Sequence, residues 1–199
     1  MDLDTIFASR HSIRDYEKKE IPFNLLAEVI DSTRGAPSAG NMQNWVLIVV
    51  QDKKMMNTLA QSCLDQYWIS QSGALIVVCY DDRNAKALFP KDYQEFSIQN
   101  TAIVSIYMML KATELGLGAC WVNIEKKENV SINLKLPSYI TPSHILALGY
   151  SKGMHKKTSK LDPKVVTYFE SYGIKKRDTS IFPIKKQIEK IKKKLKSKN

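Results

Sequence analysis

The sequence predicts a single α+β domain, on three observations. Two short apolar runs, 45–50 and 74–80, are rich in β-branched residues and bounded by polar segments, which is typical of buried strands. The segment 97–114 carries the longest helical pattern, and between Ala102 and Leu110 it is apolar nearly all round, as expected for a buried helix. A chain of 199 residues that is 44% hydrophobic is long enough to bury a sizeable core.

The N-terminal stretch predicts a short helix that ends near Ser9, followed by an extended segment with alternating chemistry. Arg10, Ser12 and Arg14 would then present a guanidinium, a hydroxyl and a second guanidinium on one face. Guanidinium groups bind oxyanions through paired, charge-assisted hydrogen bonds, so this face suits a phosphate or another polyanionic edge. The alternative is a basic turn that only faces solvent.

A helix begins near Pro22 and ends near Arg34, and it leads into the loop 36–45, which reads APSAGNMQNW. Pro, Ser and Gly already supply the turn chemistry of this loop. The amides of Asn41 and Gln43 are additional, and in an extended segment both would project from one side. Such a pair suits a flat heterocycle with carbonyls and ring nitrogens, although two amides could equally tie down the loop.

The remaining elements follow from periodicity and turn residues. We expect a helix over 52–63, a loop over 81–91, a helix end and a new strand over 115–124, a helix over 129–136 and a strand over 144–149. The glycines of 115–124 follow a helix, which is opposite to the order in dinucleotide-binding folds, so we reject a Rossmann fold. The apolar helix over 97–114 requires either a deep core or a partner subunit that covers one flank.

The net charge of +10 is confined to the end of the chain. Residues 1–150 hold 14 Lys and Arg against 16 Asp and Glu, whereas residues 151–199 hold 16 against 4. A nucleic-acid-binding domain more often spreads cations over a folded face, so we expect neither nucleic acid nor membrane as a partner. An apolar stripe in the tail predicts a helix that clasps a partner subunit, docks on an anionic surface or stays solvated, and we favour the clasp. The stripe consists of Ile184, Ile188, Ile191 and Leu195.

The three cysteines and three histidines indicate neither a disulfide framework nor a metal site. The cysteines are odd in number, widely spaced and set mostly among apolar residues, so we expect buried free thiols. The histidines show no ligand spacing with them, and we predict no metal. The longest apolar run is too short to span a bilayer, and the N-terminus lacks a leader pattern, so we expect a cytoplasmic protein.

Two motifs in sequence, Ser9-Arg-His-Ser-Ile-Arg14 and the loop 36–45, resemble the FMN-dependent nitroreductase family. That family carries Arg-x-Ser-x-Arg (or Lys) followed by Pro-Ser-x-x-Asn-x-Gln-Pro-Trp. The resemblance covers about residues 1–165 and implies a three-layer fold, with a central, mostly antiparallel sheet flanked by helices, in an intertwined homodimer. We assign residues 1–173 to this FMN-binding domain and residues 174–199 to a basic, helical C-terminal extension.

The resemblance also implies roles for individual residues. Arg10 and Lys160 would bind the FMN phosphate with help from Ser12, and Arg14 would lie against the N1–O2 edge, where reduction places negative charge. Asn41 and Gln43 would address the ribityl and pyrimidine groups, Ser38 is a candidate contact to the partner's flavin, and the backbone at 121–123 would approach N5. The implied cofactor-binding set is Arg10, His11, Ser12, Arg14, Pro37, Ser38, Asn41, Gln43, Trp121, Val122, Asn123, Lys157 and Lys160.

Two positions depart from the family pattern. Only Lys160 matches the family's Lys-x-Arg element, with Lys157 as a candidate replacement for the missing cation, and Asn44 stands where the family usually has Pro. Without that proline, the sequence alone does not determine how rigid the loop is. No side chain stands out as an acid or base for the chemistry.

The implied function is an FMN-dependent oxidoreductase that takes hydride from NADH or NADPH and reduces a small organic acceptor, such as a nitroaromatic or quinone, in a ping-pong reaction. One alternative is a flavoprotein of the same fold with another role, namely dehalogenation, flavin fragmentation or flavin storage. The other is a protein whose basic tail binds nucleic acid or a membrane surface; its binding would weaken steeply with salt.

Overall fold

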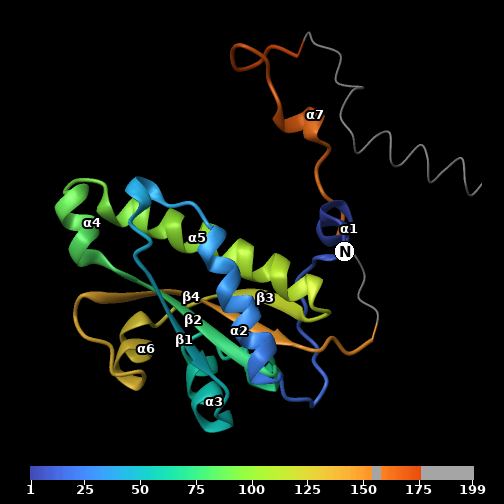
Figure 1. Ribbon diagram of the computed structural model, residues 1–199, viewed down its shortest axis with the longest axis vertical. Coiled ribbons are helices and arrows are strands. Elements are labelled where there is room, and N and C mark those ends of the chain that lie inside the picture. Colours follow the sequence, from blue (N-terminus) through green and yellow to red (C-terminus); the bar gives the residue numbers. More distant parts are fainter. Residues whose placement is uncertain (154–157, 176–199) are drawn as a thin grey trace, which may run out of the picture. The chain divides into compact units, whose positions relative to one another are not determined.

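Four antiparallel strands in the order β1-β2-β4-β3 form the central sheet of the computed structural model, which describes residues 1–153 and 158–175 (Figure 1). The predicted α+β architecture is confirmed, with helices on both faces of the sheet. The strands are β1 Trp45–Val50, β2 Ala74–Asp81, β3 Gly118–Asn123 and β4 Ile140–Gly149. The main helices are α1 Leu3–Ser9, α2 Phe23–Asp31, α3 Lys53–Gln61, α4 Asp82–Leu88, α5 Tyr93–Glu114 and α6 Lys127–Asn133. Three 3-10 helices, η1 Ser32–Gly35, η2 Ala39–Asn41 and η3 Tyr67–Gln71, lie in the connections.

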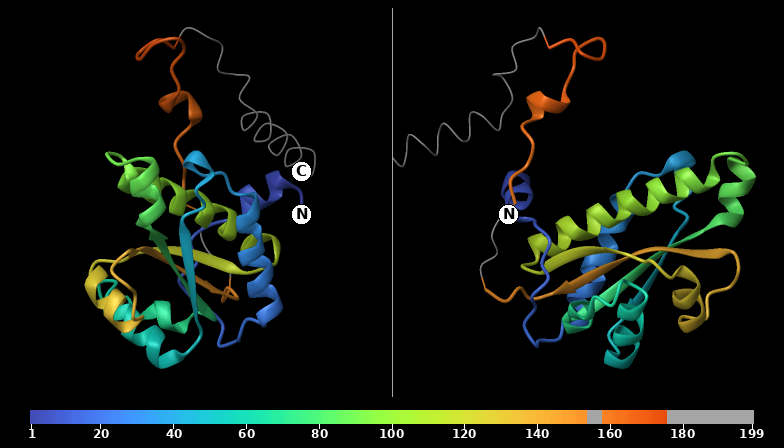
Figure 2. Two further views of the ribbon diagram at one scale, coloured as in Figure 1. Left: turned by 60° about the vertical axis from the view of Figure 1, so that its left-hand side comes forward. Right: turned by 180° about the vertical axis from the view of Figure 1, so that it is seen from behind.

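Each face of the sheet carries its own hydrophobic core, which explains why β2 is apolar along its whole length. Leu75 and Val77 pack with α3 and α6 on one face, whereas Ile76 and Val78 pack with α2 and α5 on the other. Successive strand residues point to opposite faces, so a strand covered on both faces reads as a continuous apolar run. The view from behind in Figure 2 shows α5 along one face of the sheet and α3 with α6 on the other.

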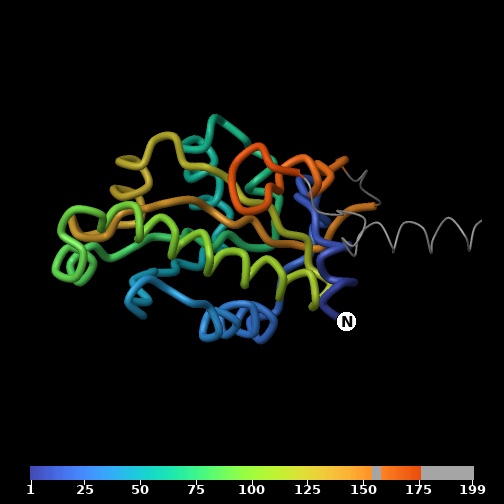
Figure 3. The backbone as a smooth tube through the Cα atoms, turned by 90° about the horizontal axis from the view of Figure 1, so that it is seen from above, coloured from blue at the N-terminus to red at the C-terminus, as the bar shows by residue number. Residues whose placement is uncertain are grey.

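Helix α5 is buried on one side only. Its inner side carries Val104 and Met108, both fully buried, whereas Ile98, Ile106 and Tyr107 remain 51%, 46% and 37% exposed. The sequence offered a deep core or a partner subunit as explanations of this apolar helix, and the exposed flank favours the partner. Helix α1 packs against α5 and α4 lies at the opposite end of it (Figure 3).

The expected loop over 81–91 is wrong, because most of it forms α4. Asp81 caps the helix, since its carboxylate accepts a hydrogen bond from the Arg83 backbone N–H at 3.0 Å. Asp82 and Lys86 then pair one turn apart at 2.7 Å. A short polar helix of this kind shows little hydrophobic periodicity. In the sequence it is indicated only by the capping residue and by the pair of opposite charges.

The chain divides into two compact units, Met1–His155 and Lys156–Asn199. In the second unit the short helix α7, Pro163–Val166, is capped by the Asp162 carboxylate. The predicted boundary at residue 173 falls inside this second unit and stays a prediction. The proposed tail helix lies in 176–199, outside the described residues. No helix of the described residues is both long and apolar enough to cross a membrane.

Candidate cofactor site

The segment that follows α1 lies along the outer edge of β3. Ser12 forms a parallel bridge with Ala119, and the Ile13 N–H donates to the Ala119 carbonyl at 3.1 Å. A Cβ on Gly118 would lie only 2.7 Å from the Ile13 side chain, so this glycine is needed for close packing of the segment. Tyr16 fastens the far end, because its hydroxyl lies 2.7 Å from the Ile13 carbonyl and 3.1 Å from that of Ala147 in β4.

Burial alternates over residues 12–14, where Ser12 and Arg14 are exposed and Ile13 is buried, whereas Arg10 and His11 are both half-buried. That Arg10, Ser12 and Arg14 share one binding face stays a prediction. The side chains of Arg10, Ser12 and Arg14 all act on the thiol of Cys120. Burial raises the pKa of this thiol, whereas the positive charges of Arg14 and Arg10 and a hydrogen bond with Ser12 lower it. Within residues 1–153 and 158–175 neither arginine forms an ion pair with a carboxylate, and the Arg14 guanidinium lies over the Trp68 ring, 5.9 Å from its centroid. Two positive charges therefore face the outer edge of β3.

A cavity of about 340 Å³ lies beside Arg10. Its described lining residues include no carboxylate, and they combine Arg10 with the hydroxyl residues Ser9, Thr113 and Ser151. Gly116 and Gly153 line it with φ values of +77° and +76°, and a Cβ on either would meet no atom within 4 Å. The lining residues are Ser9, Arg10, His11, Ile13, Thr113, Gly116, Leu117, Gly118, Ala119, Ser151 and Gly153. This composition is suited to an anion such as a phosphate.

A second cavity, of about 840 Å³, lies between the connector 15–20 and the turn 70–73. It is larger, but it contains none of the predicted site residues. Its lining carries both lysines and carboxylates, and Lys53 is already bonded to the carbonyls of Ser70 and Ser72. The smaller cavity is therefore the better candidate for the cofactor.

The loop that carries Asn41 and Gln43 is not extended, so that expectation is wrong. Gly40, Asn41 and Gln43 have φ values of +55°, +53° and +46°, and the Gln43 N–H donates to Ser38 Oγ at 3.0 Å. Asn and Gly tolerate this left-handed region better than other residues, and the Ser38 hydroxyl supports the turn. The two amides nevertheless act together, since Gln43 Nε2 donates to Asn41 Oδ1 at 3.0 Å.

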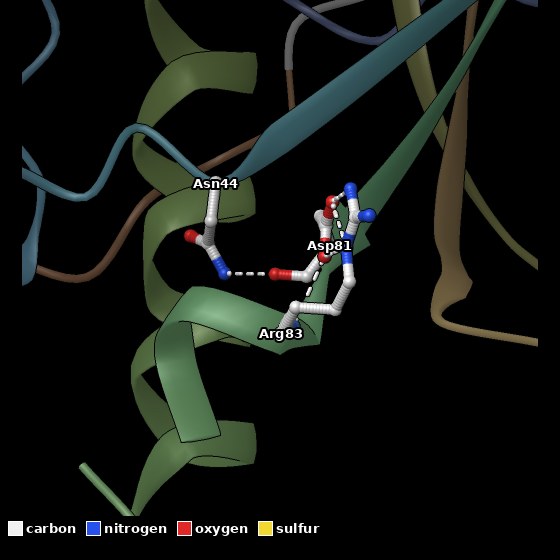
Figure 4. A network of polar contacts seen from close by, with 3 residues as sticks. All are labelled: Asn44, Asp81 and Arg83. Carbon is white, nitrogen blue, oxygen red and sulfur yellow. Dashed lines mark hydrogen bonds and ion pairs between the residues drawn. The ribbon is translucent and has the colours of Figure 1, made fainter. Parts of the chain in front are cut away.

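Asn44 holds this loop in place through hydrogen bonds of its side chain. Its side chain is 7% exposed, and Nδ2 donates to the Asp81 carbonyl at 3.1 Å (Figure 4). Nδ2 also donates to Ser97 Oγ at 2.8 Å. Oδ1 accepts from Asn100 Nδ2 at 2.9 Å, and Asn100 Oδ1 in turn accepts from the Ala39 N–H at 2.9 Å. The residue that replaces the family's Pro thus ties the loop to α5 through side-chain bonds.

The segment 10–14 and the loop 36–45 lie near opposite ends of α5 (Figure 1). Asn100 holds the loop, whereas Thr113 lines the cavity with Arg10. A helical rise of about 1.5 Å per residue separates those two positions by about 20 Å. Within one chain, therefore, the two predicted halves of the site do not converge.

The remaining predicted residues lie on β3 and in the second unit. Trp121 and Asn123 share one face of the strand, and Trp121 Nε1 donates to Asn123 Oδ1 at 2.9 Å. Val122 is buried in the core on the α3 side, which leaves only its backbone for a ligand. Lys160 is exposed in the second unit, and Lys157 lies outside the described residues.

Sequence reasoning missed Asn100, Trp68 and His144, which support predicted residues without having been predicted themselves. Their partners lie far away in the sequence, so no local pattern marks them. The three cysteines are free and buried, as expected.

Comparison with known proteins gives a consistent family match. The model of the Nitroreductase family matches residues 7–150. An FMN reductase [NAD(P)H] of Bacillus subtilis is 27% identical over 177 residues, covering 81% of this chain and 70% of that protein. An NADH dehydrogenase of Thermus thermophilus is 27% identical over 178 residues, covering 75% and 87%. The solved FMN-dependent nitroreductase of Clostridium difficile R20291 superposes with a TM-score of 0.74 at 26% identity, covering 85% of this chain and all of that one.

Proposed function

Because this chain belongs to the nitroreductase family, we propose that it is an FMN-dependent oxidoreductase that uses NADH or NADPH to reduce a small organic acceptor, such as a nitroaromatic or quinone, by a ping-pong mechanism. The observation that carries this proposal is the row of Arg10, Ser12 and Arg14 on the edge of β3. The names of the relatives support the cofactor and the nicotinamide.

The residues at the smaller cavity fit the phosphate end of FMN. Arg10 supplies the cation, the glycine backbone leaves open space, and the described lining carries no carboxylate to repel the phosphate. Ser12 adds a hydroxyl beside Arg10, and Lys160 is proposed as a further phosphate ligand. The chemistry that bound FMN would supply is transfer of an electron pair from a nicotinamide to the acceptor.

Arg14 is the residue to which we assign the electrostatic role. Its guanidinium is a fixed positive charge that would face the N1–O2 edge of the ring and stabilise negative charge there. The Trp68 ring limits the positions that this side chain can take. The β3 backbone at 121–123 would face the N5 side of the ring.

We also propose that two copies of the chain complete each site. The apolar residues that α5 exposes, Ile98, Ile106 and Tyr107, are joined by exposed Leu3 and Phe7 of α1, which packs against α5. A two-fold axis that pairs two α5 helices in antiparallel fashion would bring the amide loop of one copy to the Arg10 cavity of the other. Ser38, Asn41 and Gln43 would then contact the partner's flavin, while burial of the apolar flank stabilises the pair.

The test is an absorption spectrum of the purified protein, taken before and after addition of NADH and of NADPH. We expect a flavin band that either nicotinamide bleaches, and a dimer by light scattering. Arg10→Ala should weaken FMN binding, whereas Arg34→Ala, a change at an exposed arginine that pairs with Asp31, should not. A wild-type protein that takes up no FMN would refute the proposal. Assays with nitroaromatic, quinone and halogenated acceptors then separate this activity from the other roles of the fold.

A further inference from the structure

A row of buried polar side chains lies between α5 and β4, beneath Trp121. His144 of β4 is 1% exposed, and its Nε2 lies 2.6 Å from Ser105 Oγ of α5, while its Nδ1 lies 3.0 Å from Ser143 Oγ. The Trp121 indole stacks on the His144 ring with a centroid distance of 3.4 Å and an angle of 12° between the planes. A residue at the predicted site therefore rests on an imidazole that has no role in the proposed chemistry.

The hydrogen-bond partners fix which ring nitrogen carries the proton. Thr101 Oγ1 donates its only hydrogen to the Ile98 carbonyl at 2.8 Å, because a carbonyl can only accept. Ser143 must then donate to Thr101 Oγ1, which lies 3.2 Å away. With its own hydrogen used, Ser143 Oγ accepts from His144 Nδ1. A neutral imidazole with a proton on Nδ1 accepts at Nε2, so Ser105 donates to it.

The ring is held in its neutral form. Burial lowers the pKa of His144 to about 3, and the positive charge of Lys127 contributes to the shift. The ring is therefore uncharged across the physiological range, and its hydrogen bonds keep one direction. Both ring nitrogens are bonded to side chains of β4 and α5, which leaves the face of the ring for the indole.

The position of the indole in turn orients the side chain of Asn123. Trp121 Nε1 can only donate, so the amide oxygen of Asn123 faces the indole and its NH2 group faces away. Asn123 is exposed at the end of β3. The result is a pair of N–H donors at a defined position on the stretch that we assign to the flavin.

We propose that His144 is a positioning residue for the cofactor: its Nδ1-protonated ring is a platform that fixes the Trp121 indole, which in turn holds the NH2 group of Asn123 as a hydrogen-bond donor to the flavin. This inference rests on the proposed function. It adds to the proposed site one side-chain hydrogen-bond donor, the NH2 group of Asn123, besides the backbone of β3. It also assigns to the buried His144 ring the role of supporting that donor.

The first measurement needs no flavin. In 15N-labelled full-length protein without FMN, the ring signals of His144, assigned by their loss in His144→Phe, should report the Nδ1-protonated tautomer and show no titration between about pH 5 and 8. A ring protonated on Nε2, or one that titrates in this range, would overturn the platform.

The second measurement is the dissociation constant of FMN, followed by quenching of flavin fluorescence. Trp121→Phe keeps a ring on the platform but removes the donor to Asn123, and we expect about fivefold weaker binding, the size of one lost hydrogen bond. Asn123→Ala should weaken binding by a similar factor. The double variant should be no weaker than either single one, because both remove the same contact.

Ser105→Ala and Ser72→Ala form a matched pair, since each removes a buried hydroxyl but only Ser105 bonds His144. We expect Ser105→Ala to weaken FMN binding about threefold and Ser72→Ala to leave it unchanged. If the wild-type protein binds FMN and the three variants Trp121→Phe, Asn123→Ala and Ser105→Ala bind it equally well, this inference is refuted. The proposed function is not affected by that result. Wild type that binds no FMN would instead remove the proposed function and the flavin contact together.

Discussion

Replacement of Asn44 by alanine tests how the amide loop is held. The substitution removes three side-chain hydrogen bonds, to the Asp81 carbonyl, Ser97 Oγ and Asn100 Nδ2. Each is worth about 1 kcal/mol net, and the partners that stay buried lose a bond that water cannot replace. We therefore expect the free energy of unfolding to fall by about 3 kcal/mol. For a chain of this size that corresponds to a decrease of about 6 to 12 °C in the melting temperature.

The assay is thermal unfolding followed by circular dichroism, with hydrogen exchange at the Ala39 amide as a local readout. That amide donates to Asn100 Oδ1, and Asn100 loses its support when Asn44 is removed, so its exchange should speed up. Asn133→Ala is the matched control, because Asn133 is a half-buried asparagine whose Nδ2 donates to the Asn129 carbonyl within α6. The double variant Asn44→Ala with Asn100→Ala should lose less than the sum of the two single changes.

A fall of less than about 2 °C, with exchange at Ala39 unaltered, would contradict the reasoning. It would mean that the loop is held by its own turn bonds, such as that from the Gln43 N–H to Ser38 Oγ. Asn44→Pro, which restores the usual family residue, separates backbone from side chain: the three bonds are lost but the loop gains rigidity. We expect it to fall between wild type and Asn44→Ala in melting temperature.

Three further predictions concern the charge, the interface and the buried histidine. Arg14→Ala should lower the midpoint potential of bound FMN by about 30 mV, the equivalent of about 1.4 kcal/mol, while the melting temperature stays within about 2 °C; turnover and FMN binding equal to wild type would refute the role. Ile106→Asp should split the dimer and weaken FMN binding by at least about tenfold, whereas Ile132→Asp, on the exposed side of α6, should do neither. Because folding lowers the pKa of His144, stability should fall as the pH drops from about 6.5 towards 3, by up to about 1.4 kcal/mol per pH unit, and His144→Phe should flatten that part of the profile.

The strands and long helices could be predicted because their signals are local. The run 74–80 is apolar throughout because both its faces are covered, and the alternation over 12–14 follows from a single extended segment against β3. Helix α4 was missed because its first turn depends on the Asp81 cap and one ion pair, and neither produces a hydrophobic period.

The geometry of the site was less accessible, because it depends on contacts between distant residues. The loop with Asn41 and Gln43 was expected to be extended, yet its turn is held by Asn44 and Asn100, which are far apart in the sequence. Helix α5 appeared buried all round because composition does not show which of its apolar residues the core covers. The platform under Trp121 joins three elements, and none of its hydroxyl residues stands out in the sequence.

The separation of the two half-sites along α5 has a consequence for inheritance of defects. In the proposed pairing, a chain that lacks the Arg10 cation and a chain that lacks the loop amides are each inactive as identical pairs. When both are produced in one cell, a mixed pair joins the sound cavity of one chain to the sound loop of the other and so regains one working centre. Two null alleles of this gene should therefore complement each other when their lesions lie at opposite ends of the helix, and fail to do so when they lie at the same end.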